Sequence, residues 1–370
     1  MFKGLFKFII FMGSCLFLLV LGLYWGEIKT RLLQYQALND IQTAFQKNHP
    51  KEAKALLEKN VKRFPQEPIF HLRLAHYLHQ TKQWEQAKTQ YELGLKLNPT
   101  AYDYQYNYAR LLIQLRDVNG AIQLYREILN EKPNHLGALV DLAGVYRFAG
   151  NRADALGFNE ERFPLWNWSR YYYSLALTQN PDSVKAWYGL AEVLQRDGQF
   201  APASAGYCQV IHRMPNYPLA WFNLGLSQWY QGHQENGMKL MNWALQSDHA
   251  SPYKGLASEF TTIHALRQTY FLVHKKPLPF THFPDEWIEK LNDPHPKEPF
   301  VDADFPEPLL DACQGWVQPE LNVKRPTLMP VSSTRLSLAL HAQAEKAPLP
   351  SVNEIPLNTA PEASSLNLPL

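Results

Sequence analysis

The chain lacks the features that mark most enzymes and nucleic-acid-binding proteins. Its 370 residues contain no His-Glu-x-x-His, Gly-x-Ser-x-Gly, Walker or Gly-x-Gly-x-x-Gly pattern, so the usual signatures of metalloproteases, serine hydrolases and nucleotide-binding enzymes are missing. Lys and Arg (36) nearly balance Asp and Glu (34), and no basic block points to nucleic acid. We therefore expect no enzyme activity, no cofactor, no small-molecule substrate and no nucleic-acid partner.

Cysteine is scarce, and histidine is not grouped with metal ligands. The three cysteines are Cys15, Cys208 and Cys313, and they form no Cys-x-x-Cys pair of the kind found in zinc ribbons and redox centres. We expect Cys208 to be a buried thiol; a bond to Cys313 in an oxidising compartment is the alternative. His76 and His79 share a helix face, but carboxylate or cysteine partners at suitable spacing are missing, so we expect no metal site.

Only one long apolar run is present. Phe8–Trp25 is 18 residues without a charge, which nearly spans the hydrocarbon core of a bilayer, and Tyr24 and Trp25 suit a membrane interface. No small-x-small cleavage site follows, so an uncleaved signal anchor is favoured over a cleaved signal peptide. The positive-inside rule then makes residues 1–7 a short cytoplasmic N-terminus at a bacterial inner membrane, with the rest in the periplasm. A cytoplasmic array tethered to the same membrane is the alternative.

Proline recurs at a fixed interval. Pro65, Pro99 and Pro133 are 34 residues apart, and so are Pro181 and Pro215. A period of 34 indicates stacked helical hairpins. When each proline is given the thirty-second place of a repeat, small residues fall at the eighth and twentieth places, where paired helices must approach closely. The eighth place holds Ala75, Ala109, Ala143, Ala191 and Gly225, and the twentieth holds Ala53, Ala87, Ala121, Ala155 and Ala203.

This pattern resembles the tetratricopeptide repeat (TPR) family. The best matches are Trp187-Leu190-Ala191-Ala203-Tyr207-Pro215 and Trp221-Leu224-Gly225-Ala244. The resemblance implies an all-α, right-handed superhelical solenoid of about six helix pairs over residues 34–252. We expect an amphipathic helix at 253–275 to cap it. Residues 276–370 are expected to form an extended or disordered proline-rich tail.

One step in the repeat is too long. Pro133 and Pro181 are 48 residues apart, fourteen more than the period. The alanines show the same step, which predicts a 14-residue insertion near 157–170, inside the second helix of the fourth pair. Because Pro164 opposes one continuous helix, we expect a kink or a bulged loop that can be trimmed without unfolding the array. Its aromatic residues are candidates for partner docking; the alternative is that they fold back onto the array. They are Phe163, Trp166 and Trp168.

The resemblance also implies which side chains line a concave groove. They mix both charges with aromatic rings, which suits an extended peptide. We therefore expect a membrane-anchored scaffold or adaptor that holds a protein or peptide partner, for the assembly of a bacterial envelope system. The alternative is a permanent structural subunit of an envelope complex. The predicted groove residues are Arg73, His76, Asp103, Tyr106, Asn107, Arg110, Asp141, Arg147, Lys185, Tyr188, Glu192, Arg196 and Asn223.

Overall fold

A computed structural model describes residues 2–155, 159–215, 217–248, 313, 319 and 321–326, with the backbone alone for residues 2–23. These described residues form twelve α-helices and no strand. They divide into two compact units, one up to Leu115 and the other from Arg116. The expected cap at 253–275 and most of the expected tail lie outside the described residues.

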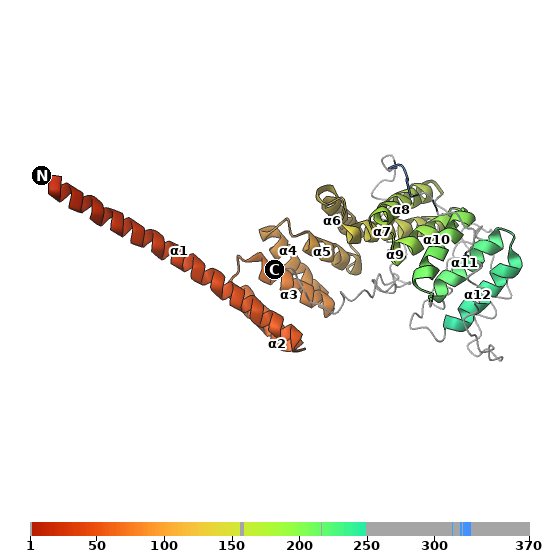
Figure 1. Cartoon of the computed structure of the whole chain (residues 1–370). Coiled ribbons are helices and arrows are strands. Elements are labelled where there is room, and N and C mark those ends of the chain that lie inside the picture. Colours follow the sequence, from red (N-terminus) through yellow and green to blue (C-terminus); the bar gives the residue numbers. More distant parts are fainter. Residues whose placement is uncertain are drawn as a thin grey trace. The chain divides into compact units, whose positions relative to one another are not determined.

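The first unit contains five helices, and each contacts the next along the chain (Figure 1). Contact between α3 and α5 shows that the first helices of successive pairs also touch. The bounds are α1 Phe2–Gln46, α2 Pro50–Arg63, α3 Pro68–Gln80, α4 Trp84–Leu97 and α5 Tyr102–Gln114.

The second unit repeats this arrangement with seven helices. Consecutive helices pack together, and α7 contacts α9, which in turn contacts α11. Both units therefore have the layering of a helical solenoid, in which hairpins stack on their neighbours. The bounds are α6 Val118–Glu131, α7 Leu136–Ala155, α8 Asn159–Gln179, α9 Val184–Arg196, α10 Phe200–Arg213, α11 Pro218–Tyr230 and α12 Gln234–Asp248.

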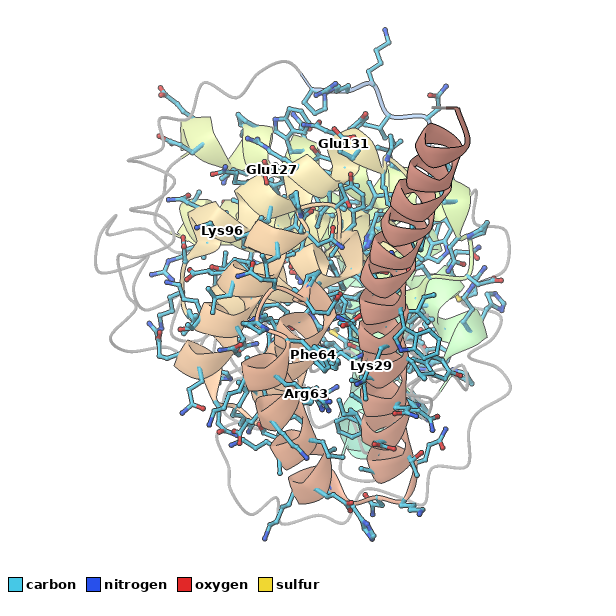
Figure 2. All side chains as sticks on the ribbon, turned by 90° about the vertical axis from the view of Figure 1, so that its left-hand side faces the viewer. Lys29, Arg63, Phe64, Lys96, Glu127 and Glu131 are labelled. Carbon is cyan, nitrogen blue, oxygen red and sulfur yellow. A yellow bond between two sulfur atoms is a disulfide. The ribbon has the colours of Figure 1, made fainter. Side chains whose placement is uncertain are left out.

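Helix α1 is 45 residues long, whereas α2 has only 14. Its C-terminal part packs against α2, whose last residue, Arg63, places its guanidinium 5.1 Å from the ring centroid of Phe64 (Figure 2). The predicted membrane span, 8–25, lies within α1, and most of its side chains are outside the described part. Among the helices as described, none has a stretch of sufficient length and apolarity to cross a membrane.

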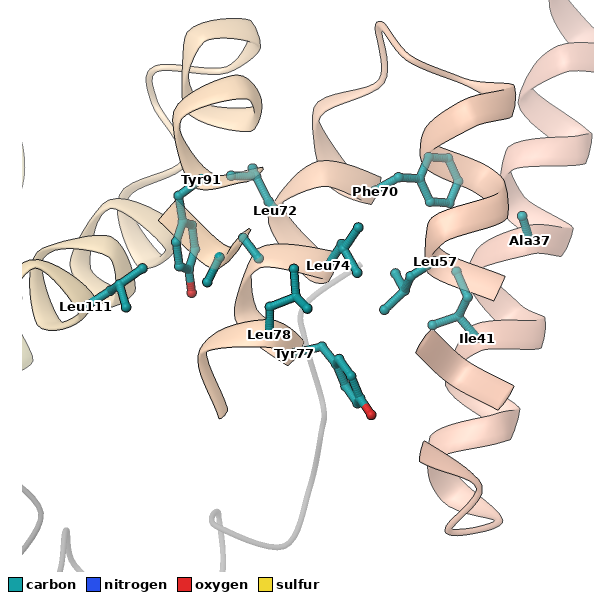
Figure 3. Packing of buried hydrophobic residues seen from close by; sticks show 12 residues of the cluster. Ala37, Ile41, Leu57, Phe70, Leu72, Leu74, Tyr77, Leu78, Tyr91 and Leu111 are labelled. Atoms are coloured by element: carbon teal, nitrogen blue, oxygen red, sulfur yellow. The ribbon is translucent and has the colours of Figure 1, made fainter. Parts of the chain in front are cut away.

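The core of the first unit joins all five helices. Ile41 from α1 and Leu57 from α2 are fully buried, and they belong to one cluster with residues of α3, α4 and α5 (Figure 3). The small residues predicted to lie between helices are also fully buried here, as Ala75 and Ala87 show. Small side chains let the helix axes approach closely, and the large ones beside them fill the remaining space.

The turns inside the helix pairs share one backbone conformation. The second residue after the first helix has a positive φ in each of five pairs. In four of them the next residue donates a hydrogen bond typical of a Schellman cap, such as Gln83 N–H to the Leu78 carbonyl at 2.8 Å. The positive-φ residues are Asn48, Lys82, Arg116, Gly198 and Gly232.

Two glycines beside polar residues lie inside helices and not in turns. Asn119-Gly120 lies inside α6, because Arg116 takes the left-handed position and Asp117 caps the helix by accepting from the Gly120 N–H at 3.0 Å. Gly150-Asn151 lies inside α7. A glycine beside a polar residue is therefore not enough to mark a turn in this chain.

The predicted insertion is not a loop. Helix α7 has 20 residues and α8 has 21, each seven more than α9 (13) and α10 (14). The fourteen extra residues therefore add about two turns to each helix of one hairpin. The prediction of a bulged loop is wrong for residues 159–170, which are helical, with Pro164 inside α8 near its start. The expected kink at Pro164 stays a prediction.

The extra turns are packed as a hairpin. A Cβ atom on Gly150 of α7 would lie 2.5 Å from Cδ1 of Trp166, so only glycine lets this indole reach the helix. The Trp166 Nε1–H donates to Asn151 Oδ1 at 3.0 Å, and Arg162 forms an ion pair with Asp154.

Ser169, not Ala155, takes the twentieth place of this repeat. Ser169 is fully buried, and its hydroxyl donates to the carbonyl of Ala143, at the eighth place, at 2.8 Å. Ala155 is instead the last residue of α7.

Candidate partner-binding surfaces

Helices α3 and α5 bring four predicted groove residues together in the first unit. Arg73 and His76 come from α3, and Tyr106 and Arg110 come from α5, the helix that α3 contacts. The guanidinium of Arg110 lies 5.8 Å from the ring centroid of Tyr106, and its charge also acts on His76. We call these four residues the α3–α5 cluster.

Two histidines of α3, His76 and His79, have lowered pKa values. Burial lowers the pKa of His76, and the charge of Arg110 lowers it further. The same two causes, with His76 itself as a third, lower the pKa of His79 to about 4. In the residues that are described, no group of three or more His, Cys, Asp or Glu side chains is arranged to hold a metal ion.

His76 presents a buried donor. The amide Nε2 of Gln80 lies 2.9 Å from Nε2 of His76. Because an amide nitrogen only donates, Nε2 of the ring accepts, and the proton of the neutral ring is on Nδ1. That Nδ1 is buried and has no hydrogen-bond partner among the described residues.

Arg73 presents a second buried donor. Only 7 % of this residue is exposed, and its guanidinium hydrogen-bonds Tyr104. Its Nε is buried and has no partner within the part of the chain that the structure describes. A buried donor left unsatisfied costs roughly 1–3 kcal/mol, so a ligand acceptor at this position would bind with that cost removed.

The remaining groove residues of α5 are Asp103, which is exposed, and Asn107, which is half-buried. Asp103 is the only acidic residue in the sequences of α3 and α5. These two helices therefore carry two arginines, Arg73 and Arg110, and one carboxylate.

In the second unit, the predicted groove residues are paired with one another. Lys185 of α9 donates to Asp141 of α7 at 2.6 Å. Arg147 of α7 pairs with Glu192 of α9, which also accepts from Asn151 at 2.8 Å. Burial opposes the charge of Arg147, but the carboxylate of Glu192 outweighs it and holds the pKa above its ordinary value. These four charges connect successive repeats.

A hydrogen-bonded group continues this connection from α9 to α11. The amide of Asn223 donates to the hydroxyl of Tyr188 at 3.0 Å, and Gln195 donates to the Asn223 carbonyl at 2.9 Å. Tyr188 and Asn223 are both buried, whereas Arg196 is partly exposed. Most predicted groove residues of this unit thus act within the protein, and the sequence pattern did not distinguish them from those of the first unit.

The aromatic residues proposed for docking do not form an exposed group. Trp166 and Trp168 are 1 % and 5 % exposed, and only Phe163 is open to solvent, at 43 %. The prediction of an exposed docking insertion is therefore wrong for both tryptophans, because both are buried in the folded chain.

One disulfide was expected only as an alternative from the sequence. Cys208 of α10 forms a disulfide with Cys313, 105 residues later, with the Cα atoms 5.5 Å apart. The expected free thiol at Cys208 is wrong, and the alternative holds. Near Cys313, Pro319 is buried, and the guanidinium of Arg325 lies 5.9 Å from the ring centroid of Trp168. The only sequence signal was the aromatic and cysteine content of a proline-rich region.

Comparison with known proteins supports the repeat assignment. The profile described as Tetratricopeptide repeat matches residues 80–135, which run from the end of α3 to the connector before α7. A search of curated proteins gives no match.

Several solved structures match this chain at low identity. A tetratricopeptide repeat protein from Parabacteroides merdae ATCC 43184 has 16 % identity and a TM-score of 0.49, over 70 % of this chain and 96 % of that one. PilW, described as a widely conserved type IV pilus biogenesis factor, has 15 % identity and a TM-score of 0.47, over 59 % and 94 %. YrrB, described as a TPR protein with an unusual peptide-binding site, has 16 % identity and a TM-score of 0.43, over 52 % and 91 %.

Because these TM-scores are below 0.5, we infer no shared function from them. The chain's prolines and turns recur every 34 residues, and its described helices pack as stacked pairs. Together with the profile match at residues 80–135, these features make the chain similar to tetratricopeptide repeat proteins.

Proposed function

We propose that this chain is a membrane-anchored scaffold that binds an extended protein segment at the α3–α5 cluster. The observation that carries the proposal is the pair of buried donors, Arg73 Nε and His76 Nδ1, which lack an acceptor among the described residues. An extended segment offers such acceptors along its backbone and in its carboxylates.

The charges of the cluster favour an acidic segment. Arg73 and Arg110 stand against Asp103 on these two helices, and the ring of Tyr106 beneath Arg110 keeps that guanidinium in place. An arginine can bind a carboxylate through two parallel hydrogen bonds, which gives both strength and direction. In the second unit, the predicted groove residues form the ion pairs Lys185–Asp141 and Arg147–Glu192.

Two features support an anchored protein whose repeats lie outside the cytoplasm. The apolar run Phe8–Trp25 is long enough for one crossing. The Cys208–Cys313 disulfide is a bond of oxidising compartments such as the bacterial periplasm. We therefore place the array on the periplasmic side of an inner membrane.

Anchoring suits a role in the assembly of an envelope system. A partner in the same membrane meets the array at a high effective concentration, so a modest affinity at the α3–α5 cluster is sufficient. Such a scaffold acts by holding partners together and needs no catalytic residue.

A permanent structural subunit is the second candidate. The exposed part of α1 carries Ile28, Leu32 and Tyr35, which are 53–61 % exposed and recur at helical spacing. An apolar face of this kind on a helix is typical of a contact with another subunit.

A peptide experiment tests the scaffold. Acidic peptides and matched peptides with Gln for Glu and Asn for Asp are titrated against the detergent-solubilised chain by fluorescence anisotropy. We expect the acidic set to bind, and Arg110→Glu to abolish binding. Lys96→Glu, an exposed lysine on α4, is the matched control (Figure 2). Equal affinity of both peptide sets would contradict the assignment.

Two further measurements test whether the chain is a scaffold or a permanent subunit, and on which side of the membrane the repeats lie. A scaffold is expected to remain monodisperse alone in detergent, whereas a permanent subunit aggregates without its partners. A reporter fused after Leu370 determines the side of the membrane, and a cytoplasmic signal would overturn the periplasmic placement.

A further inference from the structure

An aromatic surface in the second unit shares no residue with the α3–α5 cluster. Tyr146 of α7 stacks with Trp168 and Tyr172 of α8, with ring centroids 6.2 and 6.0 Å apart, and Trp168 stacks with Tyr172 at 5.6 Å. Arg126 of α6 donates to the Tyr146 hydroxyl at 2.6 Å. Burial, partly offset by Arg126, raises the pKa of Tyr146 to about 12. We call Tyr146, Trp168 and Tyr172 the aromatic surface.

A segment far along the chain meets this surface. It consists of Cys313, Pro319 and residues 321–326, which we call the tail segment. The Arg325 guanidinium lies over Trp168, and its charge also counters the effect of burial on the pKa of Tyr172. Pro319 is buried, whereas Lys324 beside Arg325 is exposed. A single hydrogen bond, Val323 N–H to the Leu321 carbonyl at 2.9 Å, turns the backbone.

The tail segment is also covalently held. Cys208, its attachment point on α10, is 3 % exposed, and the disulfide to Cys313 closes a loop of 105 residues. A single cation–π contact is worth roughly 0.5–2 kcal/mol, which is too little to order a free segment. A covalent link removes most of that entropic cost, because it makes the contact intramolecular.

We propose that the aromatic surface is a recognition site for a short segment containing arginine and proline, that the tail segment occupies it in cis, and that the Cys208–Cys313 bond controls this occupancy. With the bond closed, the chain's own segment covers Trp168. With the bond open, the segment exchanges with solvent, and a partner segment of the same chemistry can take its place.

Opening of the Cys208–Cys313 bond requires a dithiol reductant. One thiolate of the dithiol attacks a sulfur of the Cys208–Cys313 bond and forms a mixed disulfide, and its second thiolate then displaces the protein sulfur. Two electrons and two protons pass to the protein, which ends with two thiols, while the dithiol becomes a disulfide. The site does not depend on the α3–α5 cluster, so either proposal can fail alone.

Proteolysis of the full chain in detergent tests whether the Cys208–Cys313 bond holds the tail segment on the aromatic surface. Trypsin cuts after Lys324, and we expect dithiothreitol to accelerate this cut about tenfold, the factor that corresponds to about 1.4 kcal/mol. The Cys208→Ser/Cys313→Ser chain is expected to be cut at the fast rate with or without dithiothreitol. If reduction of the native chain left the rate of cleavage after Lys324 unchanged, the bond would not control the position of the tail segment.

A peptide in trans tests the recognition site without relying on a folded variant. A labelled peptide with the sequence of residues 317–328 is titrated against the chain in oxidised and reduced form. We expect binding to the reduced chain, at least tenfold weaker binding to the oxidised chain, and a similar loss when the peptide carries Arg325→Gln. The peptide with Lys324→Gln is the matched control and is expected to bind normally. Equal binding of the two variant peptides would refute the role of Arg325.

Discussion

The indole Nε1–H of Trp187 donates a 2.7 Å hydrogen bond to the carbonyl oxygen of Pro181, six residues earlier. This bond explains why the fourth place of the repeat and the proline recur together. The proline ends one helix, its carbonyl has no partner in the next helix, and the fourth-place side chain supplies one. The same six-residue pairing joins Trp221 to Pro215, Gln105 to Pro99 and His71 to Pro65.

The first prediction concerns this bond. Trp187→Phe keeps an aromatic ring but removes the donor, so the part-buried hydrogen bond to the Pro181 carbonyl is lost. We expect the free energy of unfolding to fall by about 0.5–1.5 kcal/mol in urea titrations. Trp84→Phe, at an exposed position on α4, is the control and is expected to change stability by less than about 0.5 kcal/mol. Equal effects of the two substitutions would show that ring size alone matters.

The second prediction concerns the left-handed turns. Gly198 has a φ of +78° with open space around a built Cβ atom, so Gly198→Ala introduces backbone strain and no clash. We expect a loss of about 1 kcal/mol. Lys82, at the equivalent position with a φ of +59°, is the reverse case, and Lys82→Gly is expected to stabilise the protein slightly or leave it unchanged. Chemical denaturation measures both, and a stabilising Gly198→Ala would contradict the explanation.

The third prediction concerns pH. Burial, Arg110 and His76 lower the pKa of His79 from 6.5 to about 4. The unfolded chain therefore binds a proton at His79 in a range where the folded chain does not, and stability falls as the pH decreases from about 6.5 to about 4. We expect His79→Gln to flatten this dependence in urea titrations at several pH values. His49→Gln, at an exposed turn, is expected to leave the dependence steep.

The fourth prediction concerns the ion pair between α7 and α9. Glu192→Gln leaves the buried Arg147 without its counter-charge, and such a loss typically costs about 3–5 kcal/mol. Arg147→Met combined with Glu192→Leu removes both charges and is expected to be less destabilising than the single change. A double-mutant cycle by chemical denaturation gives the coupling energy. A coupling near zero would mean that the pair does not connect the repeats.

The period of the sequence was sufficient to predict most of the fold. A 34-residue spacing sets the helix pairs, and Ala75 and Ala109 are fully buried as predicted. The site was less predictable, because a repeat position specifies the direction of a side chain but not its partner. Lys185, for example, forms an ion pair with Asp141 of the preceding repeat, and its repeat position alone did not indicate this. Such a pair depends on which residue a neighbouring repeat supplies.

The position of the insertion could not be predicted from the period either. Ala155 continues the alanine series at the correct interval, so the series favoured an insertion after it. In the structure Ser169 takes the twentieth place instead. Its side chain is small enough to approach Ala143 as an alanine would, and its hydroxyl also gains a hydrogen bond. Two equal extensions of about two turns keep the buried faces of both helices in phase, which a loop inside one helix cannot do.

The fifth prediction follows from this geometry. Deletion of residues 151–164 removes both extensions, restores the 34-residue step and leaves Gly150 where Gly198 stands in the next pair, so a left-handed turn can form there. Deletion of residues 157–170 has the same length but removes Trp166, Trp168 and Ser169, which are all buried.

We therefore expect the deletion of 151–164 to unfold cooperatively with native-like helix content. The deletion of 157–170, although it follows the alanine series, is expected to lose cooperativity, because α8 then lacks the residue that contacts Ala143. Circular dichroism at 222 nm during urea titration compares the two variants. The opposite ranking would show that the extra turns, and not the Ser169 contact, hold the fourth helix pair together.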